Sequence, residues 1–82
     1  MPNIAVVGLG NWGQHLARVF HQLESLVACC DLDNKKLVKF KKHFQNASFT
    51  ISFDEIIDNE KIDGVVIASP SAAHYNLAKK AL

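Results

Sequence analysis

Residues 4–13 read Ile-Ala-Val-Val-Gly-Leu-Gly-Asn-Trp-Gly, and this stretch decides the fold of the chain. An apolar run that predicts a buried strand ends in a Gly-x-Gly-x-x-Gly turn, and the turn leads directly into a helical pattern. Gly8 permits the tight turn off the strand, Gly10 permits close approach of a pyrophosphate, and Gly13 permits close packing of helix on strand. The N–H groups at the start of such a helix attract phosphate. The stretch therefore predicts a dinucleotide-binding turn.

The rest of the chain alternates between helix and strand patterns. A continuous apolar run over residues 26–30 is typical of a strand buried on both faces, and shorter runs predict strands over 47–51 and 64–68. Asp33 is a suitable N-cap for a helix before the third strand. Ser52, with Glu55 as its capping-box partner, begins a short helix after that strand. The helical residues expected to face the core are Trp12, Leu16, Val19, Phe20, Leu23, Leu37, Phe40 and Phe44.

This alternation predicts an α/β fold, a doubly wound parallel sheet with strand order 3-2-1-4. Ser69-Pro70-Ser71 interrupts the fourth strand, and Tyr75, Ala78 and Leu82 predict a last helix that begins at about Ala72. The sheet is then incomplete at its C-terminal side. The fourth strand is expected to keep an open edge, which favours marginal stability or self-association.

Asp31 ends the second strand, 21 residues after Gly10. A carboxylate at this place accepts hydrogen bonds from both hydroxyls of an adenosine ribose and would repel a 2′-phosphate. We therefore predict NAD as the cofactor, bound at least about tenfold tighter than NADP, a difference of about 1.4 kcal/mol. The alternative is that Asp31 caps the next helix, a role for which Asp33 competes. Lys35 and Lys36 follow closely in the sequence, and their positive charges could weaken this preference, so NADP is kept as an alternative cofactor.

The composition argues against several classes of partner. The 82 residues carry a net charge of +1, so nothing predicts binding to nucleic acid or to a membrane. No apolar run reaches the roughly 18 residues that span a bilayer, and the first residues do not resemble a signal peptide. Cys29 and Cys30 are neighbours on a predicted strand, so they should point to opposite faces as free core thiols. We therefore expect a reducing, cytoplasmic location.

Several segments together resemble the Gfo/Idh/MocA oxidoreductases, and the similarity runs across all 82 residues. They are the glycine turn, Cys30-Asp31, Phe53-Asp54-Glu55-Ile56-Ile57, and residues 62–74, which read Ile-Asp-Gly-Val-Val-Ile-Ala-Ser-Pro-Ser-Ala-Ala-His. The resemblance implies an enzyme that transfers a hydride between a nicotinamide cofactor and a sugar, nucleotide-sugar or cyclitol-type substrate.

The resemblance also implies a set of cofactor contacts. The phosphate turn would comprise the three glycines with Asn11 and Trp12, and Asp31 would hold the adenosine ribose. Ser69 and Pro70 would lie near the nicotinamide half, with His74 at the start of the helix behind them. The cofactor-binding residues expected in this way are Gly8, Gly10, Asn11, Trp12, Gly13, Asp31, Ser69, Pro70 and His74. From the residues alone, Trp12 is equally well explained as a packing residue and His74 as a helix-surface residue.

In this family a catalytic lysine lies in a Glu-Lys-Pro motif on a fifth strand, and a separate domain binds the substrate. Neither feature occurs in the sequence. We therefore expect residues 1–82 to be the N-terminal part of a dinucleotide-binding domain, without catalytic residues or metal ligands and not competent for turnover alone. The oligomeric state stays open, a homo-oligomer included. The alternatives are a non-enzymatic dinucleotide-binding or sensing module and, less favoured by the position of Gly13, a fragment of an S-adenosylmethionine methyltransferase.

Overall fold

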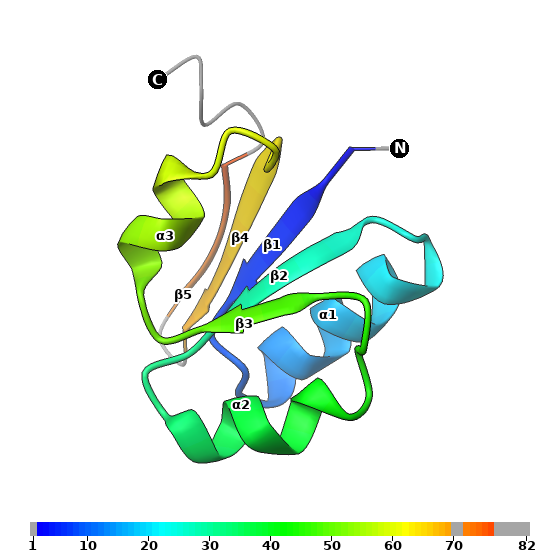
Figure 1. Cartoon of the computed structure of the whole chain (residues 1–82), viewed down its shortest axis with the longest axis vertical. Helices are drawn as coiled ribbons and strands as arrows, with labels where there is room; N and C mark the ends of the chain where they lie inside the picture. The colour runs from blue at the N-terminus through cyan, green and yellow to red at the C-terminus, as the bar shows by residue number, and fades with distance from the viewer. Residues whose placement is uncertain (1, 70–71, 77–82) are drawn as a thin grey trace.

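The computed structural model describes residues 2–69 and 72–76. These residues form one five-stranded sheet with the order β3-β2-β1-β4-β5 (Figure 1). The first four strands are mutually parallel, which confirms the predicted order 3-2-1-4 and the doubly wound arrangement. The elements follow one another as β1 (Ile4–Val7), α1 (Asn11–Gln22), β2 (Leu26–Cys30), α2 (Asn34–Lys41), β3 (Ser48–Thr50), α3 (Phe53–Asp58), β4 (Gly64–Ser69) and β5 (Ala72–Asn76).

The fifth strand corrects the prediction for the end of the chain. The spacing of Tyr75 within residues 72–82 predicts a helix, but Ala72–Asn76 is a strand that pairs antiparallel with β4, from Ser69 opposite Ala72 to Val65 opposite Asn76. Backbone donors and acceptors along the free edge of β4 gain partners in this way, and that gain outweighs a weak helical pattern. The predicted open edge on β4 is therefore also wrong. Ala78 and Leu82 lie outside the described residues.

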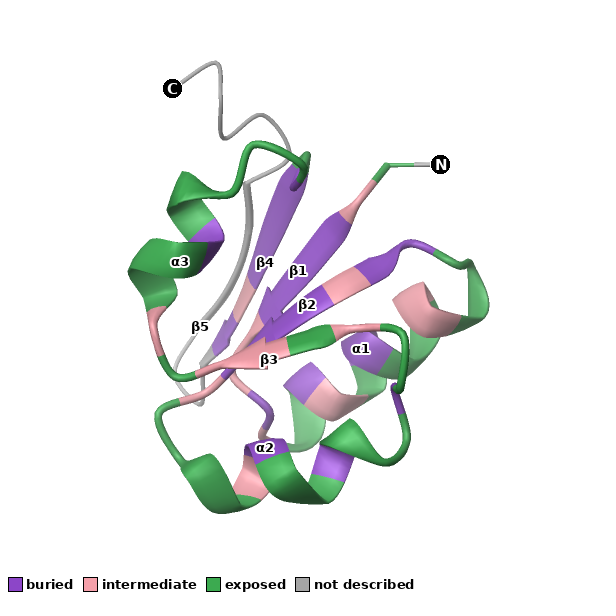
Figure 2. Cartoon of the chain, viewed as in Figure 1, coloured by how far each residue is buried: buried purple, intermediate pink, exposed green. Residues whose placement is uncertain are grey.

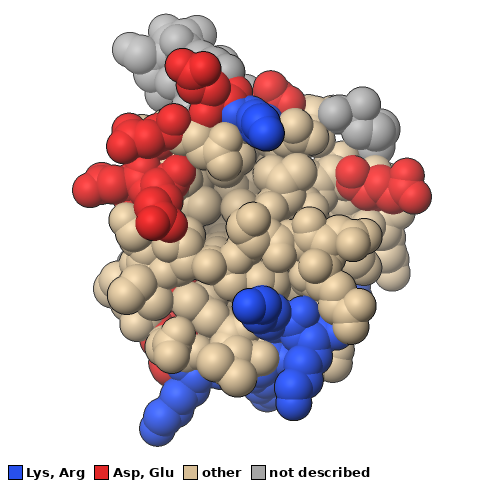
Figure 3. Space-filling view, viewed as in Figure 1, with Lys and Arg blue, Asp and Glu red and all other residues tan. Residues whose placement is uncertain are grey.

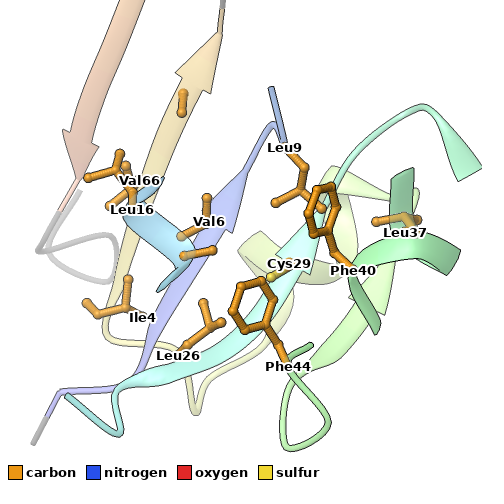
Figure 4. Close-up of a cluster of buried hydrophobic side chains, with 12 residues drawn as sticks. Ile4, Val6, Leu9, Leu16, Leu26, Cys29, Leu37, Phe40, Phe44 and Val66 are labelled. Atoms are coloured by element: carbon orange, nitrogen blue, oxygen red, sulfur yellow. The ribbon is translucent and has the colours of Figure 1, made fainter. Parts of the chain in front are cut away.

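The core is divided between the two faces of the sheet. One cluster, which includes Val6, Cys29 and Val66, packs under α1 and α2 (Figure 4). The other, which includes Cys30, packs under α3 together with Ile56. Successive residues of one strand point to opposite faces, so the buried strands in Figure 2 supply both clusters. Cys29 and Cys30 are buried free thiols in different clusters, as the sequence predicts.

Helix α1 buries only part of the stripe that its apolar pattern predicts, namely Leu16 and, in part, Phe20. Leu16 and the small residue Ala17 are buried, whereas Trp12, Val19 and Leu23 are 52%, 36% and 49% exposed. Gly13 and Ala17 allow the helix to lie close to the sheet, so its contact face centres on these small residues. The larger side chains are thereby rotated to the flank of the helix.

Two predicted helix caps are present, one of them in altered form. Asp33 accepts a hydrogen bond from the N–H of Lys35 at 2.9 Å, and Ser52 accepts one from the N–H of Glu55 at 3.4 Å. The Glu55 carboxylate instead accepts a 2.5 Å bond from the hydroxyl of Thr50. Both caps depend on residues close in sequence, which explains why they are predictable.

Within residues 2–69 and 72–76, no helix combines the length and apolar character needed to cross a membrane.

Candidate dinucleotide-binding site

The carboxyl ends of β1 and β4 meet at the middle of the sheet. The two strands are parallel neighbours, with Val7 opposite Ile67, and the chain winds away from them in opposite directions. Ligands of doubly wound sheets bind at such a switch point, outside the carboxyl ends of the strands. The glycine turn follows β1 at this edge, and Ser69 ends β4 beside it (Figure 1).

Gly8 takes a conformation that only glycine adopts readily. Its φ of +97° lies in the left-handed region, and a Cβ at this position would overlap the carbonyl oxygen of Ala68 in β4. Its N–H donates to the carbonyl oxygen of Cys30 at 2.7 Å. The turn is thus anchored between the two strands that flank β1.

Gly13 lets the first turn of α1 rest directly on the glycine turn. A Cβ on Gly13 would overlap the carbonyl oxygen of Gly8, and it would lie 3.4 Å from the Cβ of Ala68. The helix therefore begins closer to β1 and β4 than any larger residue would allow. This is the close packing that the motif predicts.

Gly10 differs from the other two glycines because open space lies beside it. A Cβ on Gly10 would have no heavy atom of the described residues within 4 Å. Gly10 is also the N-cap of α1, and no side chain of the described residues caps this helix. The first N–H groups of a helix lack intrahelical partners, and the helix dipole makes this end positive. The open side of Gly10 can therefore accept a phosphate group.

Asp31 holds the glycine turn from the end of β2. Its Oδ2 accepts a hydrogen bond from the N–H of Leu9 at 2.7 Å, and its Oδ1 accepts one from the N–H of Asp33 at 2.8 Å. Asp31 therefore does not cap α2, because Asp33 has that role. Each carboxylate oxygen can accept more than one hydrogen bond, so both retain capacity toward a ribose.

Gln14 fixes the same residue, Leu9, through its carbonyl group. Its side-chain amide donates to the carbonyl oxygen of Leu9 at 2.9 Å. The side chain of Leu9 is fully buried, so its N–H, its C=O and its side chain are all constrained. Sequence reasoning missed the bonds to Leu9 because they join residues brought together only by the turn. The strand order, which puts the ends of β1 and β2 side by side, is the signal for the bond to Asp31.

Asn11 and Trp12 begin α1 at the mouth of the turn. Both are exposed, and the indole of Trp12 stacks on the imidazole of His15 with a centroid separation of 5.8 Å. Packing of Trp12 at the start of the helix, one of the two interpretations of this residue, agrees with this stacking, although the ring is not part of the core. The exposed ring leaves a role beside a cofactor available.

The remaining predicted contacts lie at the end of β4 and beyond. Ser69 is the last residue of β4, at the same edge as the glycine turn, and Pro70 lies outside the described residues. His74 lies within β5, paired with Ile67, rather than at the start of a helix. This placement follows from the pairing of β5 with β4, which the sequence pattern did not reveal.

The thiols beside Asp31 are not candidate nucleophiles. Burial, and then the neighbouring Cys30, raise the pKa of Cys29 to about 12. Burial also raises the pKa of Cys30, with smaller contributions from the negative charges of Asp31 and Glu55. Thiols with raised pKa values stay protonated and unreactive near neutral pH. The described residues thus offer a binding geometry and no thiolate chemistry.

Comparison with known proteins identifies this arrangement. An uncharacterized oxidoreductase of Synechocystis sp. is 34% identical to this chain over an alignment 86 residues long. The alignment covers 99% of this chain and 23% of that protein. Scyllo-inositol dehydrogenase from Lactobacillus casei, with bound NAD(H) and scyllo-inositol, superposes with a TM-score of 0.74 and 27% identity over 87% of this chain and 22% of its own. A putative NADPH-dependent oxidoreductase from Desulfitobacterium hafniense superposes with a TM-score of 0.72 and 27% identity. The match covers 85% of this chain and 21% of that protein.

This chain spans 21% to 23% of the length of these three proteins. Residues 2–82 match the family described as an oxidoreductase family with an NAD-binding Rossmann fold. Because that match covers nearly all 82 residues, the chain belongs to the Gfo/Idh/MocA oxidoreductase family, in the part that forms the NAD-binding Rossmann fold.

Proposed function

We propose that this chain binds a nicotinamide dinucleotide across the carboxyl ends of β1 and β4, with NAD preferred over NADP. The observation that carries the proposal is the open side of Gly10 above the uncapped start of α1. The pyrophosphate accepts hydrogen bonds from the N–H groups of the first helical turn, where the positive end of the helix favours an anion. Gly8 and Gly13 shape the turn from below, and Asn11 and Trp12 flank its opening.

The preference for NAD rests on Asp31. Its carboxylate lies next to the turn, as its 2.7 Å bond to the N–H of Leu9 requires, and both oxygens have capacity for the ribose hydroxyls. A 2′-phosphate at this place would face the negative charge of Asp31. The exposed Lys35 and the partly buried Lys36 reduce the preference without reversing it. We expect NAD to bind about tenfold tighter than NADP.

Ser69, Pro70 and His74 complete the proposed contacts toward the nicotinamide half. The position of Ser69 at the carboxyl end of β4, beside the glycine turn, supports this assignment for the first of them. For Pro70 and His74 the support is the likeness of residues 62–74 to the family.

We also propose that residues 1–82 act as the N-terminal part of a longer dehydrogenase. The three relatives are several times longer, and the Lactobacillus casei enzyme was crystallised with scyllo-inositol. Bound NAD supplies the hydride acceptor for oxidation of a cyclitol or sugar-like substrate. The residues of this chain hold and orient the cofactor, while the base and the substrate contacts come from outside these 82 residues.

Competitive titration tests the binding proposal. The chain contains one tryptophan, Trp12, at the mouth of the turn, so its fluorescence reports occupancy directly. NAD should quench this fluorescence with an affinity about tenfold higher than NADP, and S-adenosylmethionine should not displace it. Equal or reversed affinities would remove the assignment of Asp31. Displacement by S-adenosylmethionine would instead favour the methyltransferase alternative.

A further inference from the structure

An open cleft lies between α1 and the end of α2, and it includes none of the glycine-turn residues 8–13 in its lining. The cleft has a volume of about 230 Å³. Gln14, Arg18 and His21 line one wall from α1, and their spacing of four and three residues puts them on one face of that helix. Phe40, His43 and Phe44, from the end of α2 and the turn after it, line the other wall.

The floor of the cleft is apolar and its rim is polar. Phe40 and Phe44 are buried members of the core cluster under α1 and α2 (Figure 4). His21 packs edge-on against Phe44 at a centroid distance of 5.2 Å, and His43 lies 6.0 Å from Phe40. Aromatic contacts therefore hold two imidazoles, one from α1 and one from the turn after α2, at the edge of one cavity. Neither histidine matches a sequence motif, so only the fold brings them together.

The charge around the cleft favours an anion. Its lining contains a guanidinium and two imidazoles but, among the described residues, no carboxylate. Lys39 adds a further cation, because its Nζ lies 5.4 Å from the ring centroid of Phe40. Figure 3 shows Lys and Arg side chains gathered over α2, whereas acidic side chains gather over α3 and in a smaller group at the right edge of the view. An anion that approaches this side enters a positive field.

The donors match a phosphoryl group better than a carboxylate. A phosphomonoester carries about −1.5 to −2 charges at pH 7 and presents three acceptor oxygens. The cleft offers the planar fork of Arg18, an N–H from each imidazole and the one amide N–H of Gln14 that is not donated to Leu9. We propose that the cleft between α1 and α2 binds the phosphoryl group of a small phosphomonoester, with Arg18, His21 and His43 as its principal contacts.

A titration with inorganic phosphate tests this site. The ¹H–¹⁵N NMR spectrum of the chain is followed at constant ionic strength, with saturating NAD present so that the glycine turn does not compete for phosphate. Shift changes should centre on Arg18, His21 and His43. Arg18→Gln should weaken phosphate binding about tenfold. Lys42→Gln removes the same charge from an exposed residue outside the cleft lining, and it should weaken binding less than about twofold.

Three results would overturn the proposal. Equal weakening by Arg18→Gln and Lys42→Gln would show that phosphate responds to the general charge of this side of the molecule. Shift changes confined to residues 8–13 would place the anion on the glycine turn. Unchanged affinity in Arg18→Gln, with the rest of its spectrum intact, would remove the principal contact. His43→Gln, at an exposed side chain, gives the same comparison if Arg18→Gln does not fold. If NAD itself fails to bind, the titration is repeated without it, and the location of the shifts still decides.

Discussion

Replacement of Gly10 by Val separates binding from folding at the glycine turn. A Cβ on Gly10 meets no heavy atom of the described residues within 4 Å, so the added methyl groups enter open space. The backbone at Gly10, with φ −70° and ψ −171°, is extended, a conformation that Val adopts without strain. The free energy of unfolding should therefore fall by no more than about 1 kcal/mol, the part that remains being the poorer N-cap that valine makes.

The same methyl groups should be incompatible with a pyrophosphate. In the proposed complex the diphosphate lies over the N–H groups of the first turn of α1, beside Gly10. A hydrogen bond to a charged acceptor contributes about 1.5 to 3 kcal/mol net, so the loss of two such bonds costs about 3 to 6 kcal/mol. This corresponds to a loss of NAD affinity of roughly a hundredfold or more.

Two measurements on two variants check this reasoning. Thermal unfolding reports the fold, and titration followed through Trp12 fluorescence reports NAD affinity. Gly13→Ala is the matched comparison, because its Cβ would overlap the carbonyl oxygen of Gly8 and should cost about 1 to 3 kcal/mol of stability or more. A folded Gly10→Val variant with unchanged NAD affinity would refute the phosphate cradle. If Gly10→Val lowers the free energy of unfolding as much as Gly13→Ala does, then the space beside Gly10 is not open.

Two further substitutions address the end of β2. Asp31→Asn keeps one acceptor oxygen for two backbone N–H groups, so it should lower the free energy of unfolding by about 1 to 3 kcal/mol. It should also reduce the preference for NAD over NADP. Urea unfolding checks the first effect, and parallel NAD and NADP titrations check the second. The pKa of Cys29 is raised to about 12, against 9.0 for an exposed thiol, so the unfolded chain loses this proton at a lower pH than the folded chain does. The free energy of unfolding should therefore not depend on this thiol below pH 9. It should fall by up to about 1.4 kcal/mol per pH unit as the pH rises from 9 toward 12. Urea unfolding across this range, compared with Cys29→Ala, isolates the contribution of this thiol from other groups that titrate there, and identical pH slopes would contradict the prediction.

The features that sequence reasoning predicted correctly depend on neighbours in the chain. Gly8 and Gly13 are required by the local path of the turn, and Asp33 and Ser52 cap helices that begin one residue later. The order 3-2-1-4 follows because short alternating elements restrict the connections to right-handed crossovers. Adjacent Cys29 and Cys30 had to face opposite sides of a strand.

The errors arose where tertiary packing decided the outcome. The apolar pattern of α1 weights Trp12 and Leu23 by hydrophobicity, but the helix packs through Gly13 and Ala17 because small residues allow close approach. At the end of the chain, pairing with β4 determined the conformation of Ala72–Asn76, and this placed His74 in a strand. The bonds from Asp31 and Gln14 to Leu9 depend on the path of the turn, and the cleft shared by His21 and His43 depends on how α1 and α2 lie together, so residue spacing alone does not reveal them.

The bonds to Leu9 fix the shape that the glycine turn would present to the proposed cofactor. Its N–H is held by Asp31, its C=O by Gln14, and its side chain by the core, while Gly8 is pressed against β4. The turn is thus constrained on every side except the one beside Gly10. A loop that is ordered during folding loses little conformational entropy on binding. More of the free energy of each phosphate hydrogen bond therefore contributes to affinity. In the proposed complex Asp31 therefore has two roles, one toward the cofactor ribose and one in ordering the turn. Its replacement should weaken NADP as well as NAD, although it removes the charge that disfavours a 2′-phosphate.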